Sequence, residues 1–181
     1  RQMNIKQFKN VSRFASVLLR IAAIWFGLSV ATLFFSYFFT SRDVWFNFPS
    51  PDFPILNGIG GATTNKLFPL KQAASFVVPL IVIVNCYVLW KGSQLFTYLA
   101  DGNSPFSMDF SRSVKNLGLI LIVSDIVFPI IYSLLVTIMM ESGYYYIIGV
   151  GSSLLIGLIL FAAAEIFNYG INLQQFADDT V

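Results

Sequence analysis

Asp125 is the residue in this sequence whose type and position most demand a chemical reason. It lies in the apolar run LIVSDIVFP and is the only charged residue between Lys115 and Glu141. A carboxylate near the centre of a bilayer costs about 2.5–3.5 kcal/mol on insertion scales. Pro129, four residues later, has no N–H and leaves the Asp125 backbone carbonyl without its usual helix partner. We therefore expect both unsatisfied groups to face the protein interior or a small wet cavity.

The expected partners of Asp125 are polar side chains on neighbouring helices: Asn85 on the second helix, and Ser29 or Thr32 on the first. No Lys or Arg is expected at that depth, so we expect the carboxyl group to be protonated or hydrogen-bonded through water. Two roles stay open. Asp125 is either a proton- or cation-responsive switch or ligand site, or a structural group that holds helix register by bonding Asn85. An Asp125→Asn substitution distinguishes them, because it preserves packing and removes only a pH response.

Residue types that serve most catalysis and metal binding are scarce. The chain has no histidine, the commonest general base and metal ligand, and one cysteine, Cys86. It has no phosphate-cradling glycine loop, no Cys-x-x-Cys pair and no metal-spaced cluster. We therefore predict a protein that is not an enzyme, with no catalytic residues, no metal and no cofactor. The net charge of +2 is too small to indicate direct nucleic-acid binding.

The composition places the chain in a lipid bilayer. Of its 181 residues, 56% are hydrophobic and only 11% are charged, whereas soluble domains carry about 25% charged residues. A membrane helix needs roughly 20 apolar residues, and four runs meet this length: 21–40, 72–90, 117–140 and 144–164. The sequence therefore predicts one all-α domain over residues 1–181, an integral membrane four-helix bundle with helices extending into the cytoplasm.

The distribution of Lys and Arg predicts the orientation of the spans. Eight of the eleven lie in the N-terminal segment and the connector 91–116, and three lie in the loop 41–71. Because basic residues stay on the cytoplasmic side, we expect a multi-pass protein of the cell (inner) membrane with both termini in the cytoplasm. The loop 41–71 is then external, and its prolines and glycines indicate irregular structure.

Two charged residues are expected at the inner boundary of the membrane. Arg20 and Glu165 each lie about one hydrophobic thickness, roughly 20 residues, from the outer ends of their helices. They either form an ion pair or extend separately to water.

The cytoplasmic ends of the helices carry apolar and acidic residues that could bind a partner. We expect the fourth helix to continue into the tail 165–181, where Ile166, Phe167, Leu173 and Phe176 would line one apolar stripe. The predicted partner-binding residues are Phe106, Phe176, Asp178 and Asp179, the two acids steering a basic partner. The alternative is that these helix ends simply lie on the inner leaflet.

Two segments resemble a known family. "DGNSPFSMDFSRSVKNLG", Asp101 to Gly118, resembles the Gly-x-x-Pro-Phe connector and following helix start of a bacterial four-span membrane family, domain of unknown function 2975. "AEIFNYGINLQQFADDTV", Ala164 to Val181, resembles its ending. The resemblance covers the chain from about Phe96 onward. It brings no catalytic residues, but it implies a small helix-turn-helix regulator as a partner, because members are often encoded beside one.

Three functional hypotheses follow. The first is a non-enzymatic regulatory or sensor protein that binds a cytosolic partner, such as the small helix-turn-helix regulator, at its cytoplasmic face. The second is a transporter or immunity-type membrane component with an intramembrane acidic site at Asp125; four spans are few for a solitary carrier, so it requires an oligomer or another subunit. The third is an accessory subunit that stabilises a larger complex.

Overall fold

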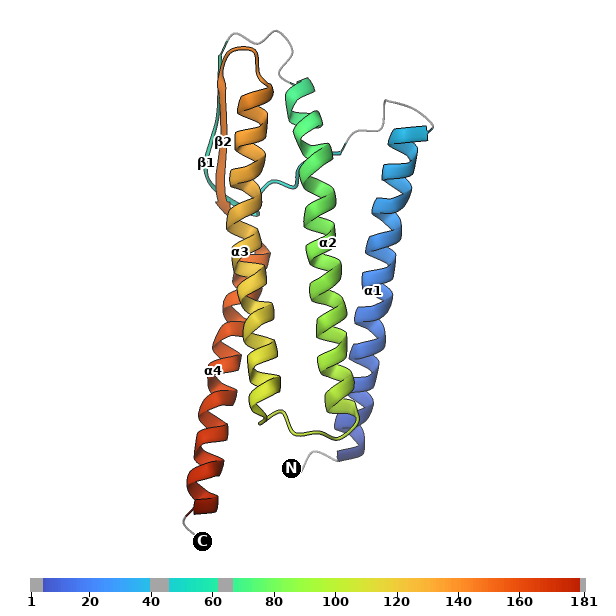
Figure 1. Cartoon of the computed structure of the whole chain (residues 1–181), viewed down its shortest axis with the longest axis vertical. Coiled ribbons are helices and arrows are strands. Elements are labelled where there is room, and N and C mark those ends of the chain that lie inside the picture. The colour runs from blue at the N-terminus through green and yellow to red at the C-terminus, as the bar shows by residue number, and fades with distance from the viewer. Residues whose placement is uncertain (1–4, 40–45, 62–66, 180–181) are drawn as a thin grey trace.

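Four long helices dominate the computed structural model, which describes residues 5–39, 46–61 and 67–179. They are α1 (Ile5–Phe39), α2 (Leu67–Ala100), α3 (Met108–Met139) and α4 (Ser152–Asp179). All four are long and apolar enough to cross a membrane, and they run along the long axis of the molecule (Figure 1). The predicted all-α membrane fold is therefore confirmed, and the chain is a multi-pass membrane protein.

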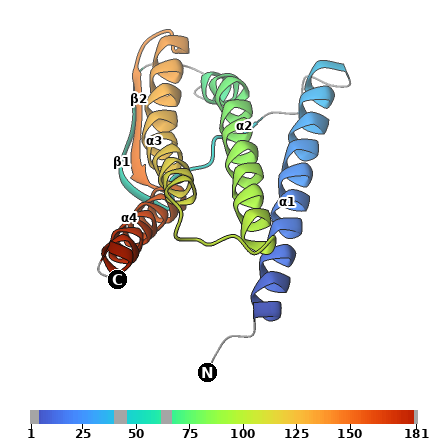
Figure 2. The ribbon, with the colours of Figure 1, turned by 60° about the horizontal axis from the view of Figure 1, so that its bottom comes forward.

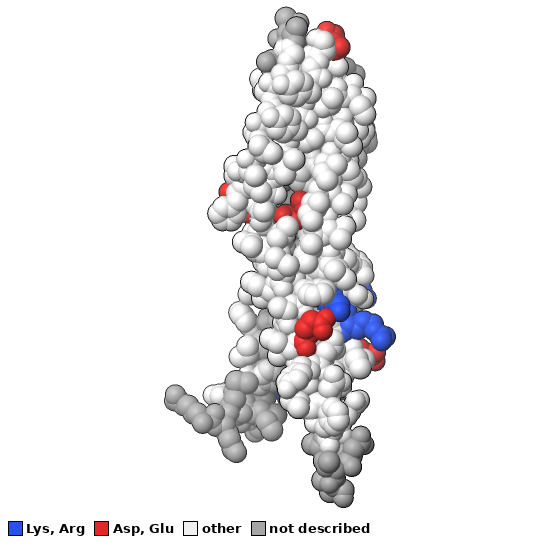
Figure 3. All heavy atoms as spheres, turned by 90° about the vertical axis from the view of Figure 1, so that its left-hand side faces the viewer, with Lys and Arg blue, Asp and Glu red and all other residues white. Residues whose placement is uncertain are grey.

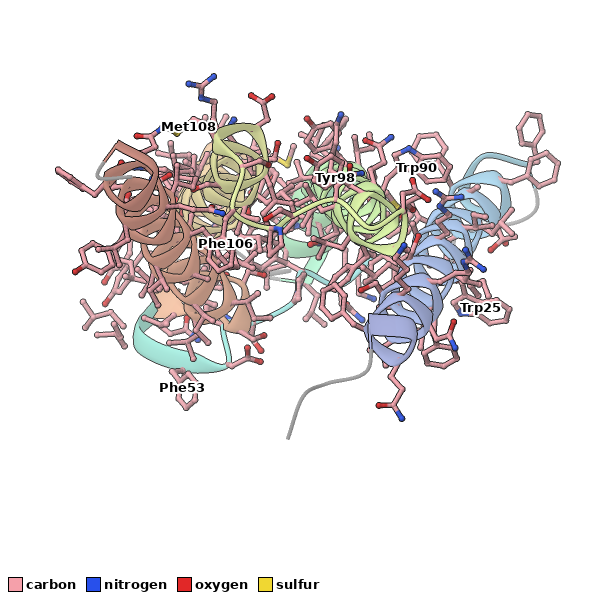
Figure 4. The ribbon with its side chains drawn as sticks, turned by 90° about the horizontal axis from the view of Figure 1, so that it is seen from below. Trp25, Phe53, Trp90, Tyr98, Phe106 and Met108 are labelled. Atoms are coloured by element: carbon pink, nitrogen blue, oxygen red, sulfur yellow. The ribbon has the colours of Figure 1, made fainter. Side chains whose placement is uncertain are left out.

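The helices pack in chain order, α1 on α2, α2 on α3 and α3 on α4. Seen from below and from an inclined direction, they form a row (Figures 2 and 4). Large apolar side chains cover the outside of this row; Trp25 and Phe53 point away from the helices in Figure 4 and are well exposed. Exposed apolar surface of this extent matches a hydrocarbon environment and not water.

Small residues allow the closest helix approaches. On α3 and α4, Gly118 and Gly157 face each other so closely that a Cβ on either would lie 2.7 Å from the backbone oxygen of the other. Nearby, the buried Ser111 donates a hydrogen bond of 2.9 Å to the backbone oxygen of Ala164. Such small residues let helices associate in lipid, where van der Waals contact drives packing.

A two-stranded antiparallel sheet completes the fold. Its strands are β1 (Phe53–Gly60) and β2 (Tyr144–Val150). The edge of β2 that faces α3 is bonded to hydroxyl groups: Ser133 Oγ accepts from Ile147 N at 3.1 Å, and Thr137 Oγ1 accepts from Tyr145 N at 3.1 Å. Backbone groups at membrane depth need such internal partners.

The sheet corrects two sequence predictions. The run 144–164 is not one helix, because 144–150 forms β2 and the helix begins only at Ser152. The loop 41–71 is not wholly irregular, because it contains β1. Short apolar runs rich in aromatic and β-branched residues suit a strand as well as a helix, and hydropathy does not separate the two.

The two ends of the molecule differ. The start of α1 and the end of α4 lie at one end, here called the termini end, and the end of α3 lies at the other, here called the opposite end (Figure 1). One apolar core joins α2, α3 and β2 toward the opposite end and includes Val77, Val136 and Ile147. A second core toward the termini end joins α2, α3 and α4 through Leu99, Phe110 and Ala164.

Candidate functional site

The positions of charged residues locate the bilayer along the helices. On α2, Lys91 lines a small cavity together with Asn116 of α3, so these residues lie at one level beside Lys115. Lys71 lies twenty residues from Lys91, about 30 Å of helix, which matches the hydrocarbon thickness of a bilayer. Asp125 lies ten residues beyond Lys115, about 15 Å. It therefore lies close to the middle of the membrane.

Asp125 binds the end of a helix that begins inside the membrane. Its Oδ2 accepts a hydrogen bond of 2.8 Å from the backbone N–H of Gly151, which separates β2 from α4. Gly151 is buried, and a Cβ at this position would collide with the Asp125 carboxyl group. Any other residue here would force the Asp125 carboxyl group to move, so the glycine lets the carboxylate approach the backbone. β2 and α4 follow one another along the long axis of the molecule and are joined at this contact (Figure 1).

A second carboxylate, Asp52, binds the same helix end. Its Oδ2 accepts hydrogen bonds of 2.7 Å from both the backbone N–H and the Oγ of Ser152. The first N–H groups of a helix have no partner within it, and the helix dipole adds positive potential there, so carboxylates stabilise this end. Asp52 precedes β1 and reaches α4 from the segment 46–52. The two acids hold that segment, α3 and α4 together.

A cavity of about 490 Å³ opens beside these two carboxylates. Its walls come from α1, α2, α3, the segment 47–52 and the α4 start at 151–153. Both polar and apolar side chains line it, and among the described residues that do so none is Lys or Arg. Figure 3 shows acidic atoms in a hollow halfway along the molecule, well apart from the charged cluster toward the termini end.

The structure brings together only part of the predicted intramembrane site. Asn85 lines the same cavity as Asp125, but no hydrogen bond joins the two side chains. Ser29 and Thr32 are exposed on α1 and do not line the cavity. Their hydroxyls donate 2.8 Å hydrogen bonds to backbone oxygens of their own helix, a common alternative for such residues in helices. Asn85 therefore shares a cavity with Asp125 without a hydrogen bond to it, whereas the predicted contact of Asp125 with Ser29 or Thr32 is wrong.

The predicted ion pair between Arg20 and Glu165 is also wrong. Glu165 pairs with Lys115 at 2.6 Å between Oε1 and Nζ. Arg20 instead donates from Nε to Ser93 Oγ at 3.2 Å and from Nη2 to a threonine of α2. The row arrangement explains the error, because α1 packs on α2 and α4 packs on α3, which leaves the first and fourth helices on opposite sides.

The predicted partner-binding residues have different surroundings. Phe106 is exposed, yet its ring packs edge to face on Phe167 with centroids 6.1 Å apart. Phe176 is exposed on α4. The side chains of Asp178 and Asp179 lie outside the described residues, although the helix itself continues to Asp179.

Sequence reasoning missed Asp52 and Gly151. Asp52 is a hundred residues from its partner Ser152, so the spacing of residues in the sequence could not indicate that the two are in contact. A local signal did exist for the helix start: the run Gly151, Ser152, Ser153 before an apolar segment is typical of a helix N-terminus. This signal would have divided the predicted fourth span at the observed position.

Comparison with known proteins places the chain in a family without giving it an activity. Neither a curated protein nor a solved structure matches it. A family model described as "Protein of unknown function (DUF2975)" matches residues 59–181. The matched region begins well before Phe96 and includes α2, α3, β2 and α4, hence both Asp125 and Gly151. Since the match covers more than half of the chain, this four-span membrane protein belongs to the DUF2975 family.

Proposed function

We propose that this chain is a non-enzymatic regulatory protein of a bacterial cytoplasmic membrane, with its termini end in the cytoplasm. In this proposal the part of α4 beyond Glu165 is a docking surface for a cytosolic protein. The excess of Lys and Arg at that end supports the orientation.

One observation carries the proposal: α4 bears an exposed apolar stripe where it leaves the membrane. The residues of this stripe, here called the docking stripe, are Ile166 (67% exposed), Tyr169 (66%), Leu173 (52%) and Phe176 (73%). Their spacing of three, four and three residues places them on one face of the helix. It is also the spacing of the apolar seam through which helices pair.

The docking stripe is distinct from the face of α4 that is already occupied. Phe167, which was predicted to lie in the apolar stripe, packs instead on Phe110 with ring centroids 5.5 Å apart. A Cβ on Gly170 would lie 2.8 Å from the Phe106 ring, so this residue also contacts the connector. One face of α4 therefore packs on the rest of the chain, and another face, with Ile166, Tyr169 and Leu173, is exposed.

The direction of α4 argues against burial of the docking stripe in lipid. Beyond Glu165 the helix continues along the long axis of the molecule and extends past the other three helices (Figure 1). A helix that lay on the inner leaflet would have to turn into the membrane plane. A straight continuation carries the stripe away from the bilayer, where a partner has to cover it.

A small helix-turn-helix regulator is the partner we propose. The family resemblance implies it, and its short helices can supply an apolar face for helix-to-helix docking. Asp178 and Asp179 at the chain end add negative charge that favours a basic DNA-binding protein. Held at the membrane, such a regulator would be kept from DNA until α4 released it.

The test is photo-crosslinking from the docking stripe in intact membranes. A photo-reactive amino acid replaces Leu173, and the crosslinked protein is identified by mass spectrometry. A small helix-turn-helix protein is expected, and the crosslink should disappear when Tyr169 and Phe176 are changed to Ser. The matched control changes the exposed Asn172 and Gln175 to Ser on the same helix. Crosslinks to lipid alone, or equal yields in both variants, would refute the proposal.

Transport is a second candidate function, favoured by the cavity at mid-membrane depth. A carboxylate that lines an aqueous path at this depth is typical of proton- or ion-coupled carriers. The test measures proton flux into proteoliposomes with a pH-sensitive dye. Transport requires flux above that of empty liposomes and its loss in Asp125→Asn; equal flux in the variant contradicts it.

A further inference from the structure

The cavity beside Asp125 is lined by acidic side chains and by no basic side chain among the described residues. Two carboxylates, Asp52 and Asp125, line it without Lys or Arg among its described lining residues. The N-terminus of α4 supplies only about half a positive charge. Charge left uncompensated at membrane depth is costly because water is scarce there. The cavity therefore favours an occupant that brings positive charge.

Several acceptor atoms in this cavity are available to such an occupant. Asp125 and Asp52 each use Oδ2 to hold α4, and no hydrogen bond to Oδ1 of either is found within the described part of the chain. Asn85 also lines the cavity and makes no hydrogen bond to a described residue. Its amide oxygen can accept a hydrogen bond from an ammonium group.

The size and walls of the cavity exclude a bare ion as the occupant that fills it. At about 490 Å³ it falls within the range of about 300–1,000 Å³ typical of small-molecule sites. Much of its wall is apolar: Phe26, Val30, Ile81, Val82 and Phe128 contribute from three helices. An apolar groove of about 730 Å³ between α1 and α2 adjoins it and shares Val30 and Val82. These walls suit a hydrocarbon or aromatic body.

We propose that this cavity binds an organic cation, an ammonium group carried on an apolar body. The ammonium lies between the free carboxylate oxygen of Asp125 and the Asn85 amide, and the body lies against the α1 and α2 walls. Phe26 and Phe128 add aromatic faces that attract cations. The inference concerns binding only, so it holds whether the protein is a sensor or a transporter, and its failure would leave the docking stripe untouched.

The experiment measures ligand-dependent thermal unfolding of the full chain in lipid nanodiscs. The probes are phenylethylammonium, hexylammonium and benzyltrimethylammonium, and 2-phenylethanol is the uncharged analogue of the first. A ligand that binds only the folded protein raises the unfolding temperature in a saturable way. At least one amine is expected to do so, with an apparent affinity at least tenfold above that of 2-phenylethanol.

Variants connect the binding to the cavity. Asp125→Asn is expected to weaken amine binding at least tenfold. Asp109→Asn, which removes an exposed carboxylate from the first turn of α3 outside the cavity, should leave it unchanged. If Asp125→Asn does not fold, Val30→Trp fills the cavity from α1 without altering either acid and should also weaken binding. Absence of saturable binding by all three amines, equal binding of 2-phenylethanol, or full binding by the cavity variants overturns the inference.

Discussion

The contact between Gly118 and Gly157 gives the sharpest test of the packing that positions α4. A Cβ on Gly118 would lie 2.7 Å from the Gly157 oxygen and 3.0 Å from the Phe161 nitrogen. On Gly157 it would lie 2.7 Å from the Gly118 oxygen and 2.8 Å from Ile122 Cγ1. Most of these atoms are backbone and cannot rotate away. Either substitution by alanine therefore forces α3 and α4 apart.

The magnitude follows from two opposing effects. Overpacking a close contact costs about 1–3 kcal/mol. Alanine recovers up to about 1 kcal/mol through its higher helix propensity. With the full recovery, we therefore expect Gly118→Ala and Gly157→Ala each to destabilise the protein by up to about 2 kcal/mol, and each to be less stable than a Gly→Ala change that meets no close contact. The double variant should cost less than the sum, because the first substitution already separates the helices and the two sites share one contact.

The assay is equilibrium unfolding of the purified protein in mixed micelles with increasing SDS fraction. Gly92→Ala is the matched control, because a Cβ there would meet its nearest neighbour, Leu19 Cδ1, at an ordinary 3.6 Å. This control should be neutral or slightly stabilising. If Gly118→Ala and Gly157→Ala unfold at the same SDS fraction as Gly92→Ala, the close packing of α3 on α4 is refuted.

Three further predictions concern single contacts. Asp52→Asn should loosen the segment 46–52 from α4, detected as faster alkylation of a cysteine introduced at Ser50, while unchanged labelling would contradict the contact. A double-mutant cycle on Lys115 and Glu165 should give a coupling below about 1 kcal/mol that falls with added salt, because both side chains are partly exposed; a larger, salt-independent coupling would disagree. Thr137→Val should destabilise by about 1–3 kcal/mol, because it leaves the Tyr145 N–H without its acceptor; SDS-unfolding curves that coincide with the parent would disprove that role.

Hydropathy was sufficient to predict the helices but not the break in the fourth crossing. The first three spans needed only apolar length: 72–90 lies inside α2, 117–140 ends at the C-cap of α3, and 21–40 matches α1 up to Phe39, where the described residues pause. The prediction of the fourth span failed because the composition of Tyr144–Val150 suits a helix as well as a strand. Tertiary contacts decide which of the two forms. Hydroxyls of Ser133 and Thr137 supply those contacts on α3. In the sequence, Ser133 and Thr137 show no sign of this role, because it exists only where β2 packs against α3.

The same break explains why Asp125 was identified while its partner was not. Its cost in lipid is a property of the residue and can be read from the sequence. Its partner is the backbone N–H of Gly151, which becomes available only because α4 begins there. Asp52 likewise has a role only after the chain brings 46–52 to mid-membrane depth. The cost of a charged residue in lipid is predictable from its type and depth, but its partners depend on where helices end and on which helices are neighbours.

The position of α4 gives the proposed sensor a direct route from the cavity to the docking stripe. A single helix runs from Ser152, held by Asp52, to the stripe residue Phe176, a length of about 36 Å. An occupant that changes how the two carboxylates hold the helix start would move or tilt the helix, and the displacement would reach the stripe because the helix is continuous. The substitution Ala162→Pro would interrupt that continuity, because proline breaks or kinks a helix. In the proposed mechanism this substitution should leave amine binding at the cavity intact and abolish any effect of the amine on crosslinking from Leu173. An amine effect that persists through the kink would show that α4 is not the connection.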